Sequence, residues 1–200
     1  MLKTIYRTLA LSLIAAAPAA AHAQFYKLHQ VDLGVNATGE FTRTLTSNST
    51  NQQYTTDALG FLFSLKEHPV SWAGVEFNYG FNKYAQQFSA PAGTAYVKSY
   101  NHEATAAYLF HPHIKHLQPF VAVGGGAIDF LPAQGVVSNQ WRGAGLLEAG
   151  LDVPTKNPHL GFRFQGRSLI YRAPNFYASA VSTHEWVATV EPSGGVYFRF

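Results

Sequence analysis

The sequence predicts an all-β protein, namely an up-and-down antiparallel transmembrane β-barrel of about eight strands. Three features of the sequence support this fold. Apolar and polar residues alternate with a period of two through most of the chain, and long polar links alternate with short links that contain proline. An apolar run preceded by basic residues also opens the chain. The length of 200 residues, of which 12% are charged, fits one domain.

The N-terminal segment has the pattern of a cleaved signal peptide. Lys3 and Arg7 precede an apolar run over residues 9–17, and Ala21-His22-Ala23 forms an Ala-x-Ala cleavage site. The run is shorter than the roughly 20 apolar residues of a membrane-spanning helix. We therefore expect a signal peptide over residues 1–23 and a barrel domain over residues 24–200. Because the latter has no second apolar segment of helix length, it can enter a membrane only as strands.

The composition excludes several other classes of protein. There is no cysteine, which excludes disulfides, thiolate metal sites and a cysteine nucleophile. The formal net charge is only +3, and the basic residues are scattered, so we expect no nucleic-acid partner.

The alternation of side chains defines the strands. In residues 73–82, odd positions hold Ala, Val, Phe, Tyr and Phe, whereas even positions hold Gly, Glu, Asn, Gly and Asn. A period of two is typical of a strand with two unlike faces. Applied along the chain, the pattern predicts eight strands, over residues 28–42, 55–65, 72–84, 98–110, 119–131, 142–153, 160–172 and 184–200.

The links between these strands differ in length and composition. Three are short and contain proline, over residues 66–71, 111–118 and 154–159. The other four are mostly longer and rich in Ser, Asn, Gln, Thr and Ala, over residues 43–54, 85–97, 132–141 and 173–183. In an up-and-down barrel, alternate links lie on the same rim. The sequence therefore predicts one rim of tight turns and one rim of long loops.

The chemistry of the polar face distinguishes a membrane barrel from a soluble lipid-carrying barrel. A soluble barrel would carry Lys and Glu on a wet exterior, whereas this polar set is mostly Gly, Ala, Asn and Thr with sparse carboxylates. Such residues fit a narrow interior. Aromatic residues near the strand ends are also typical of girdles at the two bilayer interfaces. They are Phe41, Phe61, Trp72, Phe81, Tyr84, Tyr100, Phe110, Phe120, Phe130, Trp141, Tyr171 and Trp186.

The last eight residues resemble a C-terminal pattern of outer-membrane barrels, in which polar-x-Gly-x-x-aromatic-x-aromatic is presented to the assembly machinery. Ser193, Gly195, Phe198 and Phe200 occupy the pattern positions. The resemblance implies that the last strand is recognised during insertion. Pro192 departs from the pattern, since a proline removes a donor from the hydrogen-bond ladder, and it suggests a bulge or a local change of register.

More of the chain resembles the eight-stranded OmpA/OmpX and opacity-type barrel family. Residues 118–126 are similar to the fifth strand of such barrels, and residues 143–152 and 163–167 are similar to the sixth and seventh. The resemblance extends over nearly the whole mature chain. It implies an integral protein of the cell outer membrane in a Gram-negative envelope.

Alternation also assigns charged residues of both signs to the lumen. They are Asp32, Glu40, Glu76, Glu103, Glu148, Glu191, Arg163, Arg167 and Arg199. Because buried charges are tolerated only when paired and hydrogen-bonded, we expect an ion-pair network that fills the barrel, formed chiefly by Glu76, Glu103, Glu148, Arg163, Arg167 and Arg199. A selectivity constriction for small solutes is the alternative, although an eight-stranded interior is only wide enough for side chains.

The nine histidines do not form a convincing metal or catalytic site. His111, His113 and His116 fall in a predicted turn with no carboxylate nearby in the sequence. No histidine is followed two residues later by serine, the pair found in lipid A deacylases of this barrel size, and His184-Glu185 has no identifiable third group. We predict no catalytic residue, no metal and no cofactor.

The sequence therefore predicts a non-enzymatic outer-membrane protein with a structural or surface-interaction role through long extracellular loops. Expected partners are outer-membrane lipids, lipopolysaccharide and the assembly machinery, and a monomer is expected. Two alternatives remain, a lipid A-modifying enzyme and a small-solute, porin-like channel. The loops carry the specific function in such proteins, and their ligand cannot be read from the sequence.

Overall fold

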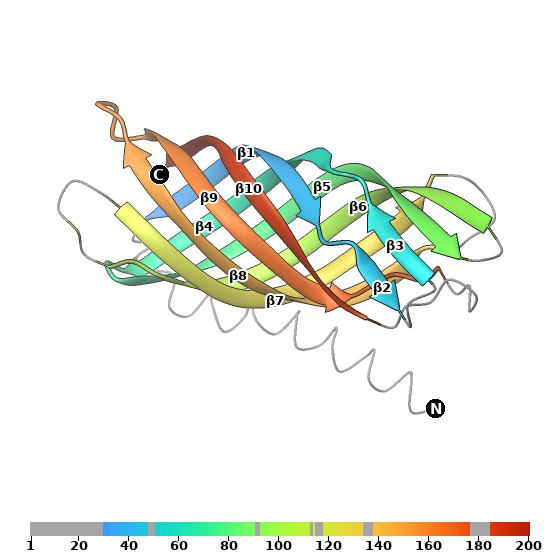
Figure 1. The fold of residues 1–200 in the computed structure, drawn as a ribbon. Helices are drawn as coiled ribbons and strands as arrows, with labels where there is room; N and C mark the ends of the chain where they lie inside the picture. Colours follow the sequence, from blue (N-terminus) through green and yellow to red (C-terminus); the bar gives the residue numbers. More distant parts are fainter. Residues whose placement is uncertain are drawn as a thin grey trace, which may run out of the picture.

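The computed structural model describes residues 30–47, 51–90, 93–112, 114, 118–133, 138–176 and 185–200. Within these residues it forms a closed eight-stranded antiparallel barrel, which confirms the predicted fold class (Figure 1). The barrel strands are β1 (Val31–Thr42), β4 (Ala58–Val70), β5 (Ala73–Ala90), β6 (Gly93–Phe110), β7 (Gln118–Pro132), β8 (Gln140–Pro154), β9 (Leu160–Arg172) and β10 (Trp186–Arg199).

Each barrel strand pairs with its neighbour in the chain, and pairing between β1 and β10 closes the sheet. Closure leaves no barrel strand with an unpaired edge, which a β structure in a bilayer requires. Residues 30 and 200 lie at the end of the barrel that carries the tight turns, which we call the turn end, and the opposite end is the loop end. No helix in the described part of the chain is both long and apolar enough to cross a membrane.

Two of the predicted long loops contain strands. The link over 43–54 includes β2 (Leu45–Ser47) and β3 (Asn51–Thr55), and the link over 85–97 is almost entirely the paired ends of β5 and β6. β3 pairs with β5, so these hairpins form one sheet that extends the barrel wall at the loop end (Figure 1). The sequence suggested loops because strands beyond a bilayer need no apolar outer face.

Smaller differences concern the boundaries and the last strand. β4 continues to Val70, so the first turn is shorter than the predicted 66–71. Around Pro192 the register is unchanged, because Thr38 pairs with Ser193 and Phe41 with Val190. The bulge suggested by Pro192 is therefore wrong. In the β1–β10 ladder, Gly39 and Glu40 of β1 have no paired residue between these two pairs. The β9–β10 ladder is uninterrupted through Pro192.

Side chains on the two faces of the wall differ as the alternation predicts. Along β1 the even positions from Asp32 to Glu40 are buried, whereas Leu33, Val35 and Phe41 are about half exposed. Exposed apolar side chains recur on the outer face of the other barrel strands, while most of the buried polar and charged side chains lie on the inner face. An apolar exterior of this kind is suited to contact with lipid tails.

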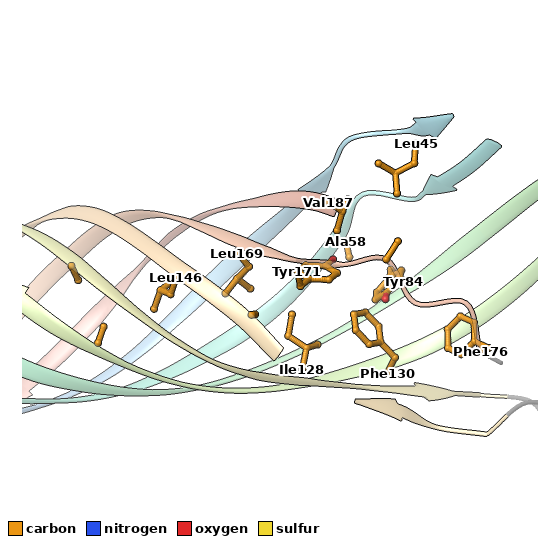
Figure 2. Packing of buried hydrophobic residues seen from close by; sticks show 14 of the residues in the cluster. Leu45, Ala58, Tyr84, Ile128, Phe130, Leu146, Leu169, Tyr171, Phe176 and Val187 are labelled. Carbon is orange, nitrogen blue, oxygen red and sulfur yellow. The ribbon is translucent and has the colours of Figure 1, made fainter. Parts of the chain in front are cut away.

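Four of the twelve predicted girdle aromatics face the lumen instead of the lipid. Tyr84, Phe120, Phe130 and Tyr171 are at most 4% exposed, because each lies on the inward parity of its strand. All four belong to one cluster of buried apolar side chains, and Tyr84, Phe130 and Tyr171 lie in its loop-end part together with Phe176 (Figure 2). Trp72, Trp141 and Trp186 do point outward, near the ends of the wall.

Candidate functional site

Ion pairs fill the turn half of the lumen. Arg163 on β9 donates two hydrogen bonds to Asp152 of β8, from Nε at 2.6 Å and Nη2 at 2.8 Å. The two residues are direct cross-strand partners, and both are almost completely buried. Arg163 Nη2 also lies 3.5 Å from Asp32 Oδ2, and its Nη1 donates to the Ser64 hydroxyl. This guanidinium therefore connects strands on both sides of the barrel.

Asp32 is the second carboxylate at the turn end that pairs with arginine. Arg199 donates to its carboxylate from Nε and Nη2 at 2.8 and 2.9 Å, and His68 Nε2 lies 3.4 Å away. The Arg199 side chain remains 16% exposed, which places it at the rim rather than in the sealed interior. The nearby His111, in the turn after β6, lies against His68 with ring centroids 4.8 Å apart and ring planes inclined by 58°. Burial, with the neighbouring His68, lowers the pKa of His111 to about 4.

Two further groups of charges lie deeper in the barrel. Lys66 Nζ and Glu76 Oε2, on paired positions of β4 and β5, are 3.6 Å apart and fully buried, and the ammonium also lies 3.3 Å from the centre of the Phe120 ring. Arg167 on β9 contacts three glutamates, which are Glu103, Glu148 and Glu191. Glu148 and Glu191 are its cross-strand partners, whereas Glu103 reaches it across the lumen from β6.

The predicted lumen residues are all placed in this region, in partnerships that alternation alone could not assign. Arg167 contacts Glu103 and Glu148, but Glu76 pairs with Lys66, and Arg163 pairs with Asp152 and Asp32. Lys66 was not among the predicted lumen residues, because the predicted strand ended one residue earlier. Asp152 was not among them either, although it has the same parity as Glu148.

The C-terminal pattern residues lie along the seam that closes the barrel. Phe198 and Phe200 are exposed on the outer face at 49% and 74%. Phe200 exchanges backbone hydrogen bonds with Val31 at 2.9 and 3.4 Å. A Cβ on Gly195 would lie 2.1 Å from the Val35 carbonyl oxygen, so only glycine allows this approach to β1. Ser193 pairs with Thr38 in the β1–β10 ladder.

A short segment after β9, residues 173–176, packs against side chains of the lumen at the loop end. The Gln140 side-chain oxygen accepts hydrogen bonds from the backbone N–H groups of Asn175 and Phe176, at 2.8 and 3.1 Å. Gln53 Nε2 donates to the Pro174 carbonyl at 3.2 Å. Phe176 is 3% exposed and packs edge-to-face on Phe88. The segment therefore continues the apolar cluster up to the mouth of the barrel.

The outer face of the extended sheet carries a row of uncharged side chains. Tyr54, Gln87 and Tyr96 are register partners on β3, β5 and β6. Tyr54 is 44% exposed and Tyr96 is 69% exposed. Adjacent strands are about 4.8 Å apart, so the two rings lie roughly 10 Å from each other across Gln87. Aromatic and amide groups of this kind can stack on and hydrogen-bond to a polar ligand without a charge.

Several of the histidines considered as metal ligands or catalytic groups lie outside the residues that the structure describes. In the described ranges no group of three His, Asp or Glu side chains is arranged to hold a metal ion. His113, His116 and His184 lie outside the described residues, as does the proposed signal peptide with its cleavage site.

Comparisons with known proteins identify the fold. No family model matches the sequence, and neither does any curated protein. Neisserial surface protein A matches with a TM-score of 0.55 and 11% identity, over 85% of this chain and 97% of the other. Two further matches score lower, OmpW of E. coli (TM-score 0.49, 12% identity, 88% and 100% covered) and Ail of Yersinia pestis (0.46, 13%, 86% and 97%).

The match to the neisserial protein is a likeness of backbone fold, and in this chain the outer face of the closed eight-stranded wall is apolar. Such an exterior implies an environment of membrane lipid. The chain therefore has the fold of the OmpA-like family of eight-stranded outer-membrane β-barrels.

Proposed function

We propose that this protein is an integral outer-membrane protein that binds ligands outside the cell through its loop end, without catalysing a reaction. The observation that carries the proposal is the extended sheet formed by β2, β3 and the ends of β5 and β6. Tyr96 lies three residues beyond Ser99, the last residue of β6 in register with β7, which at about 3.4 Å per residue is roughly 10 Å of strand past the closed wall. We infer that the Tyr54–Gln87–Tyr96 row stands clear of the bilayer.

A rigid sheet is better suited to recognition than a free loop of the same length, because its side chains lose little conformational freedom when they bind. Tyrosine contributes a large contact area at low entropic cost. The row has no charge of its own, which favours a neutral polar ligand such as a glycan over a highly charged one. The ordered sheet therefore supports a surface-interaction role.

The test is an adhesion or pull-down assay with cells that display the protein. We expect the double variant Tyr54→Ala/Tyr96→Ala to lose binding while its heat-modifiable gel mobility stays that of a folded barrel. Tyr108→Ala is the matched control, since Tyr108 is an exposed tyrosine at the other end of β6. Equal binding by wild type and the double variant would refute the assignment of this face.

The alternatives are distinguished by their own assays. Lipid A incubated with purified protein and examined by mass spectrometry would reveal a modifying enzyme, and conductance across a planar bilayer would reveal a channel. The filled lumen supports neither of these. Ion pairs and the apolar cluster occupy it, and residues 173–176 lie at its loop end.

The remaining parts of the proposal concern delivery and placement. We infer that residues 1–23 are a cleaved signal peptide and that residues 24–200 form the mature barrel. In this placement the turn end faces the periplasm, the exterior contacts outer-membrane lipids and lipopolysaccharide, and the assembly machinery recognises the C-terminal strand. The proposal further takes the barrel to be a monomer.

A further inference from the structure

The ionisable side chains of the described lumen do not balance in charge. At the turn end, Asp32 and Asp152 are matched by Arg163 and Arg199, and in the middle Glu76 is matched by Lys66. The third group has one cation and four carboxylates. We call it the Arg167 cluster, and it consists of Arg167, Glu40, Glu103, Glu148 and Glu191.

Every member of the Arg167 cluster is at most 5% exposed. With all four glutamates ionised, the cluster would carry three uncompensated negative charges in a closed interior. Burying a single unpaired carboxylate is already strongly unfavourable, and charges of the same sign at short range add to the cost. The described structure can therefore hold these residues only if something neutralises them.

Glu40 shows where the neutralising group must lie. Among the described residues no cation forms a salt bridge with Glu40, and its Oε2 is buried without a hydrogen-bond partner. The titratable groups that face it are carboxyl and phenol groups, Glu103 of β6, Glu191 of β10, Tyr84 of β5 and Tyr171 of β9. The amide of Asn82 on β5 is its hydrogen-bond partner.

Glu148 is held less tightly than the other two glutamates on Arg167. Its Oε2 lies 3.5 Å from Arg167 Nε, and both of its oxygens lack a hydrogen bond. The charged groups that face it are Glu76 of β5, Lys66 of β4, and Arg167 and Arg163 of β9. In contrast, Glu103 and Glu191 accept hydrogen bonds from the Nη atoms of Arg167.

We propose that the Arg167 cluster is a proton-binding site that holds at least two protons at neutral pH, one on Glu40 and one shared among the three glutamates on Arg167. A proton converts the repulsion between two carboxylates into a hydrogen bond from one to the other. A metal ion is the less suitable counter-charge, since no group of three acidic or histidine side chains in the described ranges is arranged to hold one.

This site makes closure of the lumen dependent on bound protons. The members of the cluster come from β1, β6, β8, β9 and β10, five of the eight barrel strands. Loss of the protons at alkaline pH would leave excess negative charge in the middle of the barrel and draw water into it. Because the unfolded chain releases these protons near the ordinary glutamate pKa of about 4.3, whereas the folded chain still holds them at neutral pH, we expect the wild-type unfolding temperature to fall as the pH rises from about 4.3 into the alkaline range. The fall should be smaller in Glu40→Gln.

The direct test is infrared spectroscopy of the protein folded in lipid vesicles, over a series of pH values. Protonated carboxylic acids have a carbonyl stretch that is separate from that of carboxylates and shifts in deuterated water. We expect this band in the wild type at pH 7, its loss at alkaline pH, and the disappearance of one component in Glu40→Gln. Glu185→Gln, which changes an exposed glutamate, should leave the band unchanged.

The wild-type spectrum alone can overturn the proposal, so the test does not depend on the folding of any variant. No protonated-acid band at pH 7 in a folded barrel would refute proton binding. A metal ion bound in stoichiometric amount by elemental analysis, together with ionised glutamates, would also refute it. Failure of the ligand-binding proposal for the loop end would leave this site unaffected, because the two use different residues and different assays.

Discussion

Replacing Arg163 with Ala should destabilise the barrel more than most single substitutions. Arg163 is fully buried and is the only salt-bridge partner of Asp152 in the described structure, whereas Asp32 keeps Arg199 and His68. Removing one partner of a buried ion pair costs about 3–5 kcal/mol, because the other charge is left uncompensated. The expected loss for Arg163→Ala therefore falls in this range.

Urea unfolding from lipid vesicles, followed by tryptophan fluorescence and by heat-modifiable gel mobility, provides the measurement. Arg43→Ala is the control, since Arg43 is exposed beyond β1 and its removal should change stability by no more than about 0.5 kcal/mol. A double-mutant cycle with Asp152→Asn adds a stricter condition. The double variant should lose less than the sum of the single variants, by about 0.5–3 kcal/mol, because it leaves no buried charge unpaired.

Two results would contradict this reasoning. If Arg163→Ala unfolds at the same urea concentration as Arg43→Ala, then water or a rearranged side chain solvates Asp152, and the pair does not stabilise the barrel. If the losses in the double-mutant cycle are simply additive, then the two side chains act independently despite the 2.6 and 2.8 Å contacts.

Three further predictions concern processing, assembly and closure. N-terminal sequencing of envelope protein should begin at Gln24, and recovery of the uncleaved chain would exclude the signal peptide. Deleting Phe200 removes one apolar side chain, whose transfer from water to an apolar environment contributes about 1.5–3 kcal/mol to stability. The variant should refold in vitro yet reach the outer membrane poorly in cells, and wild-type levels on fractionation would argue against an assembly signal. Gly195→Ala should cost about 1–3 kcal/mol because its Cβ would collide with β1, whereas Gly166→Ala, which meets open space, should fold normally in the same unfolding assay.

The sequence by itself determined the number of barrel strands and which way most side chains face. In residues 73–82 the alternation of apolar and polar residues agrees with the burial of every even position. The agreement has a simple cause. A β-strand places successive side chains on opposite faces, so the pattern follows from local geometry and the two environments of the wall. The same parity places Glu148 and Arg167 in the lumen.

Only the tertiary structure decided which residues meet across the barrel and where the sheet continues. Glu103 contacts Arg167 from the opposite wall, 64 positions away in the chain. Tyr84 and Phe130 pack together inside rather than in an interfacial girdle. Beyond the end of the barrel wall, β3 and the end of β5 pair although their composition is typical of a loop. The alternation of residues along a strand indicates which face of the wall each side chain occupies. Which distant side chains meet depends on strand tilt and register, and both are set by how the whole sheet closes.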